Sequence, residues 1–174
     1  MRARRPLGFA FPLLFIAFGL PRALVAETDK PTVDLSIYRH VSSIIWVTRN
    51  LDPVMDYWEK LGLKKIERTG VMEFPGYIYR GKPAPSTLKY GYGHIGDVFV
   101  EWVQPVAGTN IYADFLKRHG DGVVALGYAV KSGEELERQI QAFRSKGVAI
   151  VQRDQWKGAR GIGYRVFLDT AGEG

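Results

Sequence analysis

The sequence predicts an α+β fold in which one β-α-β-β-β unit occurs twice along the chain. Two stretches, 51–61 and 136–143, carry apolar residues at the spacing of a helical face. Each is followed by a glycine, Gly62 or Gly147, that suits a left-handed helix cap. Runs rich in β-branched and aromatic residues flank both helices, as expected for strands. The second unit reaches Gly174 one strand short, so it is predicted to be incomplete.

The N-terminus has the pattern of a secretory signal peptide, predicted here as residues 1–26. Residues 1–5 are basic, residues 7–20 are mostly apolar, and small Ala26 precedes Glu27. The apolar run is shorter than the roughly 20 residues of a membrane-spanning helix. We therefore expect cleavage and export, to a periplasm or outside the cell, with a retained anchor as the alternative. The sequence contains no cysteine, which excludes disulfides and thiolate metal ligands within it.

Much of the positive charge lies in the predicted signal peptide. The whole sequence has 24 Lys and Arg and 18 Asp and Glu, a formal net charge of +6. Residues 1–26 contain four arginines and no acid, which leaves 20 basic and 18 acidic residues in the rest. These charges are interleaved and form no basic stripe, so no nucleic-acid partner is predicted. The chain after residue 26 has the length of one domain.

The first unit is predicted to run from residue 38 to residue 105, after a flexible lead-in at 27–37. A β-branched and aromatic run predicts the first strand, and Asn50 is a candidate N-cap for the helix that follows. The helix leads to a short strand, a long loop and two strands of an antiparallel hairpin. The strands are predicted at 41–48, 63–68, 87–94 and 97–104, the loop at 71–86, and the hairpin turn at Ile95 and Gly96.

The second unit is predicted at 122–174, after a linker at 106–121 that contains a short helix. Ser132 and Glu135 form a capping box at the start of its main helix. The linker helix is predicted at 111–119, and the strands at 123–130, 148–152 and 164–168. Together these elements define one domain from residue 38 onward.

The loop 71–86 has two open interpretations. It combines aromatic residues with Arg80 and Lys82, and a loop of this length is often functional. In the first interpretation it closes as a lid over an anionic ligand, which Arg80 would contact. In the second it is a connection whose aromatic side chains fold onto the domain.

Glu101 is the candidate functional carboxylate. Strand alternation places it on one face with Phe99 and Val103. The opposite face carries the residues that suit packing under a helix: Val98, Val100 and Trp102. Glu101 is therefore expected to face a cavity.

The predicted hairpin turn sets the neighbours of Glu101 on the adjacent strand. With the turn at Ile95 and Gly96, Tyr90 would lie opposite Glu101 and Tyr92 opposite Phe99. A buried carboxylate beside a phenol can act as a general base or orient a ligand hydroxyl. Equally, Tyr90 could satisfy Glu101 in a purely structural role, and the sequence leaves both roles open.

Residues 91–96 of the hairpin have the glycine spacing of the dinucleotide-binding fingerprint G-x-G-x-x-G. They lack its structural context. That motif must leave a strand and open a helix whose N-terminus holds pyrophosphate. Here the β-forming run 98–102 follows, so no nucleotide site is predicted.

Three segments together resemble the vicinal oxygen chelate superfamily, which includes glyoxalase I, methylmalonyl-CoA epimerase, extradiol dioxygenases and bleomycin-resistance proteins. They are residues 99–105 (FVEWVQP), 115–122 (FLKRHGDG) and 167–172 (FLDTAG). They look most like the epimerase-like branch. The resemblance covers residues 38–174 and implies a curved, U-shaped mixed sheet with helices on its outer face, in which the second module lacks its last strand.

The resemblance also implies a place for a divalent metal ion. Members with the full site take one ligand from the first strand of each module and one carboxylate from the last strand of each. These positions fall on Ser43, Glu101 and Ala125, and beyond Gly174. Only Glu101 has ligand chemistry, and one carboxylate cannot supply the donors that Mg, Mn, Zn or Co requires. We therefore predict a degenerate metal site with no metal ligand and no cofactor.

Three functions remain open at this point. The missing ligands favour an exported glyoxalase-like protein that binds a small molecule without metal; its binding residues would be Ser43, Tyr90, Tyr92, Phe99, Glu101, Ala125 and Arg80. The second is an epimerase-like isomerase or lyase, in which catalytic Glu101 acts as general base or holds a divalent metal. The third is a strand-swapped homodimer or a nonfunctional remnant, because an incomplete module leaves an open sheet edge.

Overall fold

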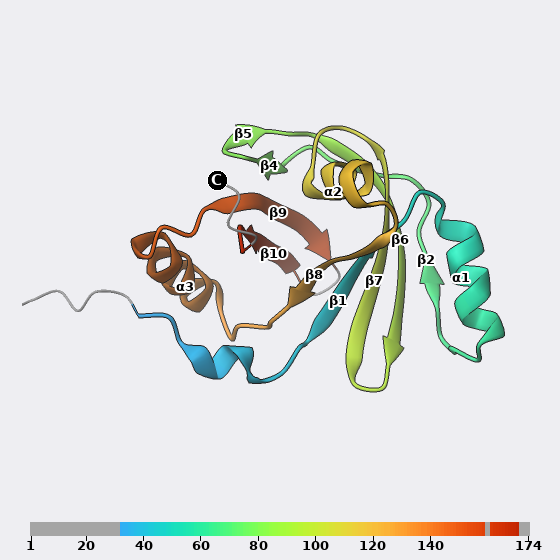
Figure 1. Ribbon diagram of the computed structural model, residues 1–174, viewed down its shortest axis with the longest axis horizontal. Coiled ribbons are helices and arrows are strands. Elements are labelled where there is room, and N and C mark those ends of the chain that lie inside the picture. Colours follow the sequence, from blue (N-terminus) through green and yellow to red (C-terminus); the bar gives the residue numbers. More distant parts are fainter. Residues whose placement is uncertain (1–31, 159–160, 171–174) are drawn as a thin grey trace, which may run out of the picture.

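The computed structural model describes residues 32–158 and 161–170, which form two β-sheets and three α-helices (Figure 1). The predicted signal peptide and the residues from 171 onward lie outside the described part of the chain. No helix within the described ranges is long and apolar enough to cross a membrane.

The larger sheet combines strands from both predicted modules. In spatial order its strands are β2 (Glu67–Arg68), β6 (Ser86–Ile95), β7 (Val98–Ala107), β1 (Ser43–Val47) and β8 (Gly122–Gly127), with β3 (Met72–Phe74) also paired to β6. β7 runs antiparallel to β6 and parallel to β1, whereas β8 is antiparallel to β1. The sheet is therefore mixed, and the predicted α+β class is confirmed.

The remaining strands form a smaller antiparallel sheet. In order they are β10 (Gly161–Leu168), β9 (Ile150–Gly158), β4 (Ile78–Tyr79) and β5 (Lys82–Pro83). Among the described residues no hydrogen-bonded ladder joins β8 of the larger sheet to β10 of the smaller one. Each of these two strands pairs on one side only within that part of the chain. Such edges suit strand exchange, and the homodimer stays a prediction.

The segment predicted as the loop 71–86 forms three short strands and connects the two sheets. β3 belongs to the larger sheet, whereas β4 and β5 belong to the smaller one. Phe74, Tyr77 and Tyr79 are buried, and the Arg80 N–H donates to the Val151 carbonyl oxygen at 2.7 Å. The aromatic side chains therefore fold onto the domain, as in the second interpretation of this loop.

The helix α1 (Leu51–Lys60) covers the outer face of the larger sheet, on the side away from the smaller sheet (Figure 1). Leu51 and Met55 pack against Val100 and Trp102, as strand alternation predicts. Asn50 occupies the N-cap position without a side-chain cap bond. The N–H of Leu51 donates instead to Oε1 of Gln104 at 2.9 Å, which ties the start of the helix to β7.

The helix α2 (Ile111–His119) has the predicted bounds but packs on the inner side of the larger sheet. Its fully buried Tyr112 lies in one core with Tyr90 and Val103 of the larger sheet and Phe167 of the smaller one. Figure 1 shows α2 at one end of the space between the sheets. The implied placement of all helices on the outer face therefore does not hold for α2.

The helix α3 (Gly133–Ser145) begins at a cap close to the predicted one. Ser132 Oγ accepts the N–H of Glu135 at 3.2 Å, while Oε2 of Glu135 accepts the N–H of Lys131 at 2.8 Å. Before β1, the end of the predicted flexible lead-in forms a short 3-10 helix, Leu35–Arg39, that the sequence did not predict. Tyr38 of this helix contacts Phe143 of α3.

The hairpin of β6 and β7 turns one residue later than predicted. Ile95 pairs with Val98, so Gly96 and Asp97 form the turn, and Gly96 takes a left-handed φ of 60°. Moving the turn by one residue moves each cross-strand partner by two. Glu101 therefore lies opposite Tyr92, and the predicted pairing with Tyr90 is wrong. An even shift preserves the face, so both tyrosines remain on the side of Glu101.

Candidate functional site

The inner faces of the two sheets meet at Arg165 of β10. Its Nη1 donates to Oε2 of Glu101 at 2.7 Å, and its Nη2 donates to Asp154 Oδ2 at 2.9 Å and to the Tyr112 hydroxyl at 2.7 Å. Its Nε donates to the same Asp154 oxygen at 3.0 Å. We call these four residues the Arg165 cluster. It links β7 of the larger sheet, β9 and β10 of the smaller sheet, and α2.

Strand pairing in the smaller sheet positions the charged residues of the cluster. Asp154 and Arg165 are cross-strand partners on β9 and β10, flanked on the same face by the pairs Gln152 with Phe167 and Trp156 with Gly163. Nε2 of Gln152 donates to Asp154 Oδ1 at 2.7 Å. Its Oε1 accepts the first N–H of α2 at 2.8 Å. The same polar side chain therefore fixes both Asp154 and the start of the helix.

The cluster contains one cation and two acids with little access to water. The side chains of Arg165, Glu101 and Asp154 are 18%, 15% and 0% exposed. Burial raises the pKa of Asp154. The positive charge of Arg165 and the hydrogen bonds that the Asp154 carboxylate accepts oppose this rise. The formal charge of the three groups is −1 when Asp154 is ionised and zero when it is protonated. In neither state is the cluster positive.

The guanidinium of Arg165 keeps its charge in this setting. Burial opposes that charge, but Tyr112, Glu101 and Asp154 surround it and hold its pKa well above the ordinary value. Its carbon also lies 5.7 Å from the ring centre of Trp156 and 5.2 Å from that of Phe167. Aromatic faces at this distance attract a cation.

Three buried tyrosines belong to the cluster or lie near it: Tyr112 within it, and Tyr77 and Tyr90 beside it. The hydroxyls of Tyr77 and Tyr90 lie 3.1 Å apart. Burial raises the pKa of Tyr90 to about 12, and it also raises the pKa values of Tyr77 and Tyr112 well above the ordinary value. These phenols stay protonated at neutral pH, so they serve as hydrogen-bonding groups and not as bases.

The raised tyrosine pKa values predict loss of stability in alkali. An unfolded tyrosine releases its proton near its ordinary pKa of 10, while the folded chain retains it, so stability present below pH 10 is lost as pH rises towards 12. These three tyrosines alone should lower the free energy of unfolding by about 3 kcal/mol between pH 10 and 11, and Tyr79 and Tyr92, whose pKa values burial also raises, add to the fall. Denaturant unfolding at each pH measures this fall.

A matched pair of variants tests the assignment to buried tyrosines. Tyr90→Phe should reduce this fall by about 1 kcal/mol, the share of one buried tyrosine between pH 10 and 11. Tyr57→Phe, at a position that is 60% exposed, should leave it unchanged. If the free energy of unfolding of the wild-type chain and of Tyr90→Phe fell equally between pH 10 and 11, the prediction would be contradicted.

A cavity of about 290 Å³ opens beside the cluster, between the two sheets. Its lining is mostly aromatic, and we call it the aromatic slot: Lys65, Glu67, Tyr92, Gly93, His94, Phe99 and Trp156. Tyr92 and Phe99 are nearly parallel, with ring centres 5.8 Å apart. The Trp156 indole covers Gly163 so closely that any Cβ there would overlap with it.

The slot adjoins the Arg165 cluster through two of its lining residues. Tyr92 is the cross-strand partner of Glu101, and Trp156 lies beside Arg165. Tyr90 stacks behind Tyr92, with ring centres 5.5 Å apart. Of the sequence-predicted binding residues, the structure therefore brings Tyr90, Tyr92, Phe99 and Glu101 together.

The other predicted binding residues are placed differently. Ser43 pairs with Phe99 and packs tightly on Gly127, at the edge of this group. Ala125 packs against the inner core. Arg80 is exposed, with its Nε donating to the Tyr79 hydroxyl at 3.1 Å and no other side-chain bond among the described residues. It lies over Tyr79 instead of joining the Arg165 cluster.

Arg165, Asp154 and Trp156 were missed from the sequence. One signal was available, because Gln152, Asp154 and Trp156 alternate in a strand pattern and share one face. A charged Arg165 inside the run 161–168 also marked a polar group within a sheet. Neither pattern states that these residues meet Glu101, which lies 64 positions from Arg165.

The residues around Glu101 do not fit the divalent metal that the resemblance implies. Ile45 is the partner of Glu101 on one side and of Ala125 on the other, so the neighbouring positions of β1 and β8 are apolar. The cation Arg165 already contacts the carboxylate at 2.7 Å. In residues 32–158 and 161–170 no three His, Asp or Glu side chains are grouped to hold a metal ion.

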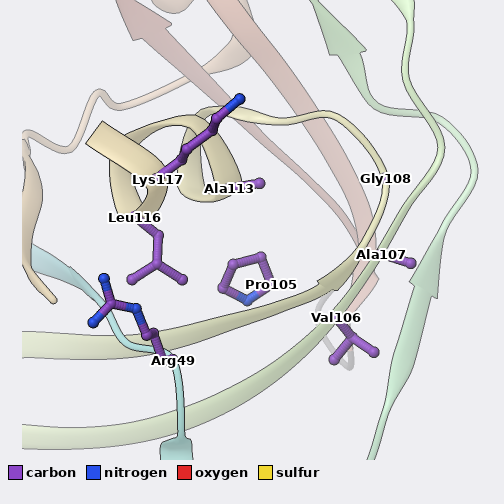
Figure 2. A pocket seen from close by; sticks show the side chains of 8 residues that line it. All are labelled: Arg49, Pro105, Val106, Ala107, Gly108, Ala113, Leu116 and Lys117. Carbon is purple, nitrogen blue, oxygen red and sulfur yellow. The ribbon is translucent and has the colours of Figure 1, made fainter. Parts of the chain in front are cut away.

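A second hollow, of about 380 Å³, lies between the end of β7 and α2 (Figure 2). It is lined by Arg49, Pro105, Val106, Ala107, Gly108, Ala113, Leu116 and Lys117. Two of these residues, Arg49 and Lys117, are cations, and Nη1 of Arg49 also lies 3.9 Å from Oδ1 of Asp121. None of its lining residues belongs to the Arg165 cluster or the aromatic slot.

Comparisons with known proteins agree with this architecture. A crystal structure of a hypothetical protein from Bacillus halodurans has a TM-score of 0.51 and 22% identity, covering 76% of this chain and 85% of that one. Methylmalonyl-CoA epimerase from Mycobacterium tuberculosis has a TM-score of 0.51 and 16% identity over 75% of this chain and 78% of its own. At these identities the likeness concerns the fold. No curated protein matches the chain.

A family model identifies the chain more directly. The model of the glyoxalase, bleomycin resistance protein and dioxygenase superfamily matches residues 43–166. The match begins in β1 and ends in β10, so it spans both modules and includes Glu101 and Arg165. The chain belongs to the glyoxalase, bleomycin resistance protein and dioxygenase superfamily.

Proposed function

We propose that this chain binds a small organic molecule between its two sheets without a bound metal ion. The observation that carries the proposal is the contact of 2.7 Å between Glu101 and Arg165. A side-chain cation neutralises the carboxylate at the position where a family metal ligand is expected. The aromatic slot next to it offers a cavity of about 290 Å³ for a ligand.

The same contact argues for binding more than for proton abstraction. A general base must reach the proton that it removes, and Glu101 would first have to break its bond to Arg165. The nearby phenols of Tyr90 and Tyr112 remain protonated because burial raises their pKa values. The epimerase-like activity, with Glu101 as base or metal ligand, is therefore the alternative that the experiment must separate.

A fragment screen by ligand-observed NMR, carried out in the presence of a metal chelator, tests the proposal. We expect fragments to bind with the chelator present, and Phe99→Ala to weaken that binding at least about tenfold, because it removes one wall of the slot. Leu116→Ala, in the other hollow, is the matched control and should leave the binding unchanged. Binding that requires added divalent metal and disappears in Glu101→Ala would overturn the proposal.

We also propose that the chain is exported. The basic, apolar and small-residue pattern of residues 1–26 supports this, and these residues lie outside the described part of the chain. Mass spectrometry of the protein recovered from a bacterial periplasm should give a chain that begins at Glu27. A full-length chain held in the membrane fraction would show a retained anchor instead.

A further inference from the structure

We propose that the ligand of the aromatic slot is a planar aromatic or heteroaromatic molecule that carries no negative charge and presents an amide-like hydrogen-bonding edge. This inference rests on the proposed function and names the ligand class of the same site. Three features carry it: the aromatic walls of the slot, the polar groups of the adjoining Arg165 cluster, and the charge balance around the slot.

The walls of the slot favour a flat apolar ligand. Tyr92 and Phe99 come from the larger sheet and Trp156 from the smaller one, so aromatic side chains face the cavity from both sides. Trp156 is 40% exposed, although a large apolar side chain gains free energy from burial. A planar ring placed between these walls would bury the Trp156 indole and gain ring-to-ring contacts.

The Arg165 cluster, which adjoins the slot through Tyr92 and Trp156, has one free donor and one free acceptor in the described residues. A guanidinium has five N–H groups, and four of those in Arg165 donate to Glu101, Asp154 and Tyr112. One N–H on Nη1 remains without a partner in the described residues. Oε1 of Glu101 likewise has none there, since its bond to Arg165 uses Oε2. An amide or lactam edge, with its C=O beside its N–H, is complementary to this pair.

The charges around the slot disfavour an anionic ligand. The Arg165 cluster has a formal charge of −1 or zero, so it has no surplus positive charge to hold a carboxylate or phosphate. At the rim the only formal charges are those of Lys65 and Glu67, which have opposite signs. An anion entering the slot would lose hydration without gaining a matching cation. Ligands with several phosphates fit this charge pattern least.

Three probes of similar size test the proposal: 2-naphthamide, 2-naphthoate and decahydronaphthalene-2-carboxamide. They are titrated, without metal, into the protein that lacks the predicted signal peptide, and their dissociation constants are measured by NMR. We expect 2-naphthamide to bind at least about tenfold more tightly than 2-naphthoate, which differs in charge. It should also bind at least about tenfold more tightly than decahydronaphthalene-2-carboxamide, because the latter has the amide but no aromatic ring.

Two variants connect these preferences to the site. Trp156→Ala should weaken the binding of 2-naphthamide at least about tenfold. Glu101→Gln makes the cluster more positive by one charge at nearly constant shape, so it should tighten 2-naphthoate and narrow the difference between the two naphthyl probes. An unchanged preference in Glu101→Gln would show that Glu101 does not set the charge selectivity.

The outcomes separate this inference from the function on which it rests. Equal or tighter binding of 2-naphthoate by the wild-type chain, equal binding of decahydronaphthalene-2-carboxamide, or no binding of any probe overturns the inference. If metal-free fragments still bind in a way that depends on Phe99, the proposed function stands. If no fragment binds without metal, both fall.

Discussion

Replacing Arg165 by alanine should lower the free energy of unfolding by about 3–5 kcal/mol, the usual cost of removing one partner from a buried ion pair. The side chain of Asp154 is fully buried and would lose both hydrogen bonds from the guanidinium. Glu101, only 15% exposed, would lose its partner as well. Chemical denaturation monitored by circular dichroism measures the change.

A matched control exists in the same sheet. Arg153 pairs with Glu137 at 3.8 Å, and their side chains are 36% and 52% exposed. Arg153→Ala should therefore change the free energy of unfolding by no more than about 0.5 kcal/mol. Arg165→Lys, which keeps a cation but loses the planar set of donors, should fall between the two if Arg165→Ala does not fold. Equal stability of Arg165→Ala and Arg153→Ala would show that the cluster contributes little to the fold.

Replacing Trp102 by alanine should destabilise the chain by about 3–5 kcal/mol, because it leaves a large cavity in the core under α1. Trp102 is completely buried and contacts Trp58, with ring centres 5.6 Å apart. Its indole N–H has no hydrogen-bond partner in the described part of the chain. Trp102→Phe should cost much less, since it keeps most of the ring and removes that unpaired donor.

The control for Trp102→Ala is the same substitution at Trp156, whose side chain is partly exposed to solvent. Trp156 is 40% exposed, so Trp156→Ala leaves no closed cavity and should cost less than half as much as Trp102→Ala. Thermal or denaturant unfolding of the three variants ranks them directly. A Trp156→Ala variant less stable than Trp102→Ala would contradict the assignment of the main outer core to Trp102.

The predictions that held are those determined by residues near one another in the sequence. The bounds of α2 were predicted without error, because Asn110 caps its start and Gly120 follows its end. The left-handed glycines Gly62 and Gly147 follow α1 and α3 as expected. The hairpin register was wrong by two residues because either Ile95 and Gly96 or Gly96 and Asp97 can form a two-residue turn.

The site was only half visible from the sequence for a physical reason. Alternation along one strand predicted the inward direction of Glu101, and that is local information. The partner of Glu101 comes from the other sheet, and no local pattern sets that meeting. The metal-ligand positions of the superfamily fall on Ser43 and Ala125 in this chain. The cation that contacts Glu101 is instead the guanidinium of Arg165. The composition of the loop 71–86 suggested a role for Arg80 that its position over Tyr79 does not support.

The absence of a ladder between β8 and β10 in the described residues has a mechanical consequence. Two chain segments connect the sheets, one from β3 to β6 and one from β8 through α3 to β9, and α2 packs against both sheets. In the aromatic slot, side chains from the two sheets set the spacing. We therefore expect the width of the slot to change by small rotations of one sheet against the other, without loss of backbone hydrogen bonds. The Arg165 cluster would limit this opening, and a ligand wider than the empty cavity could then enter.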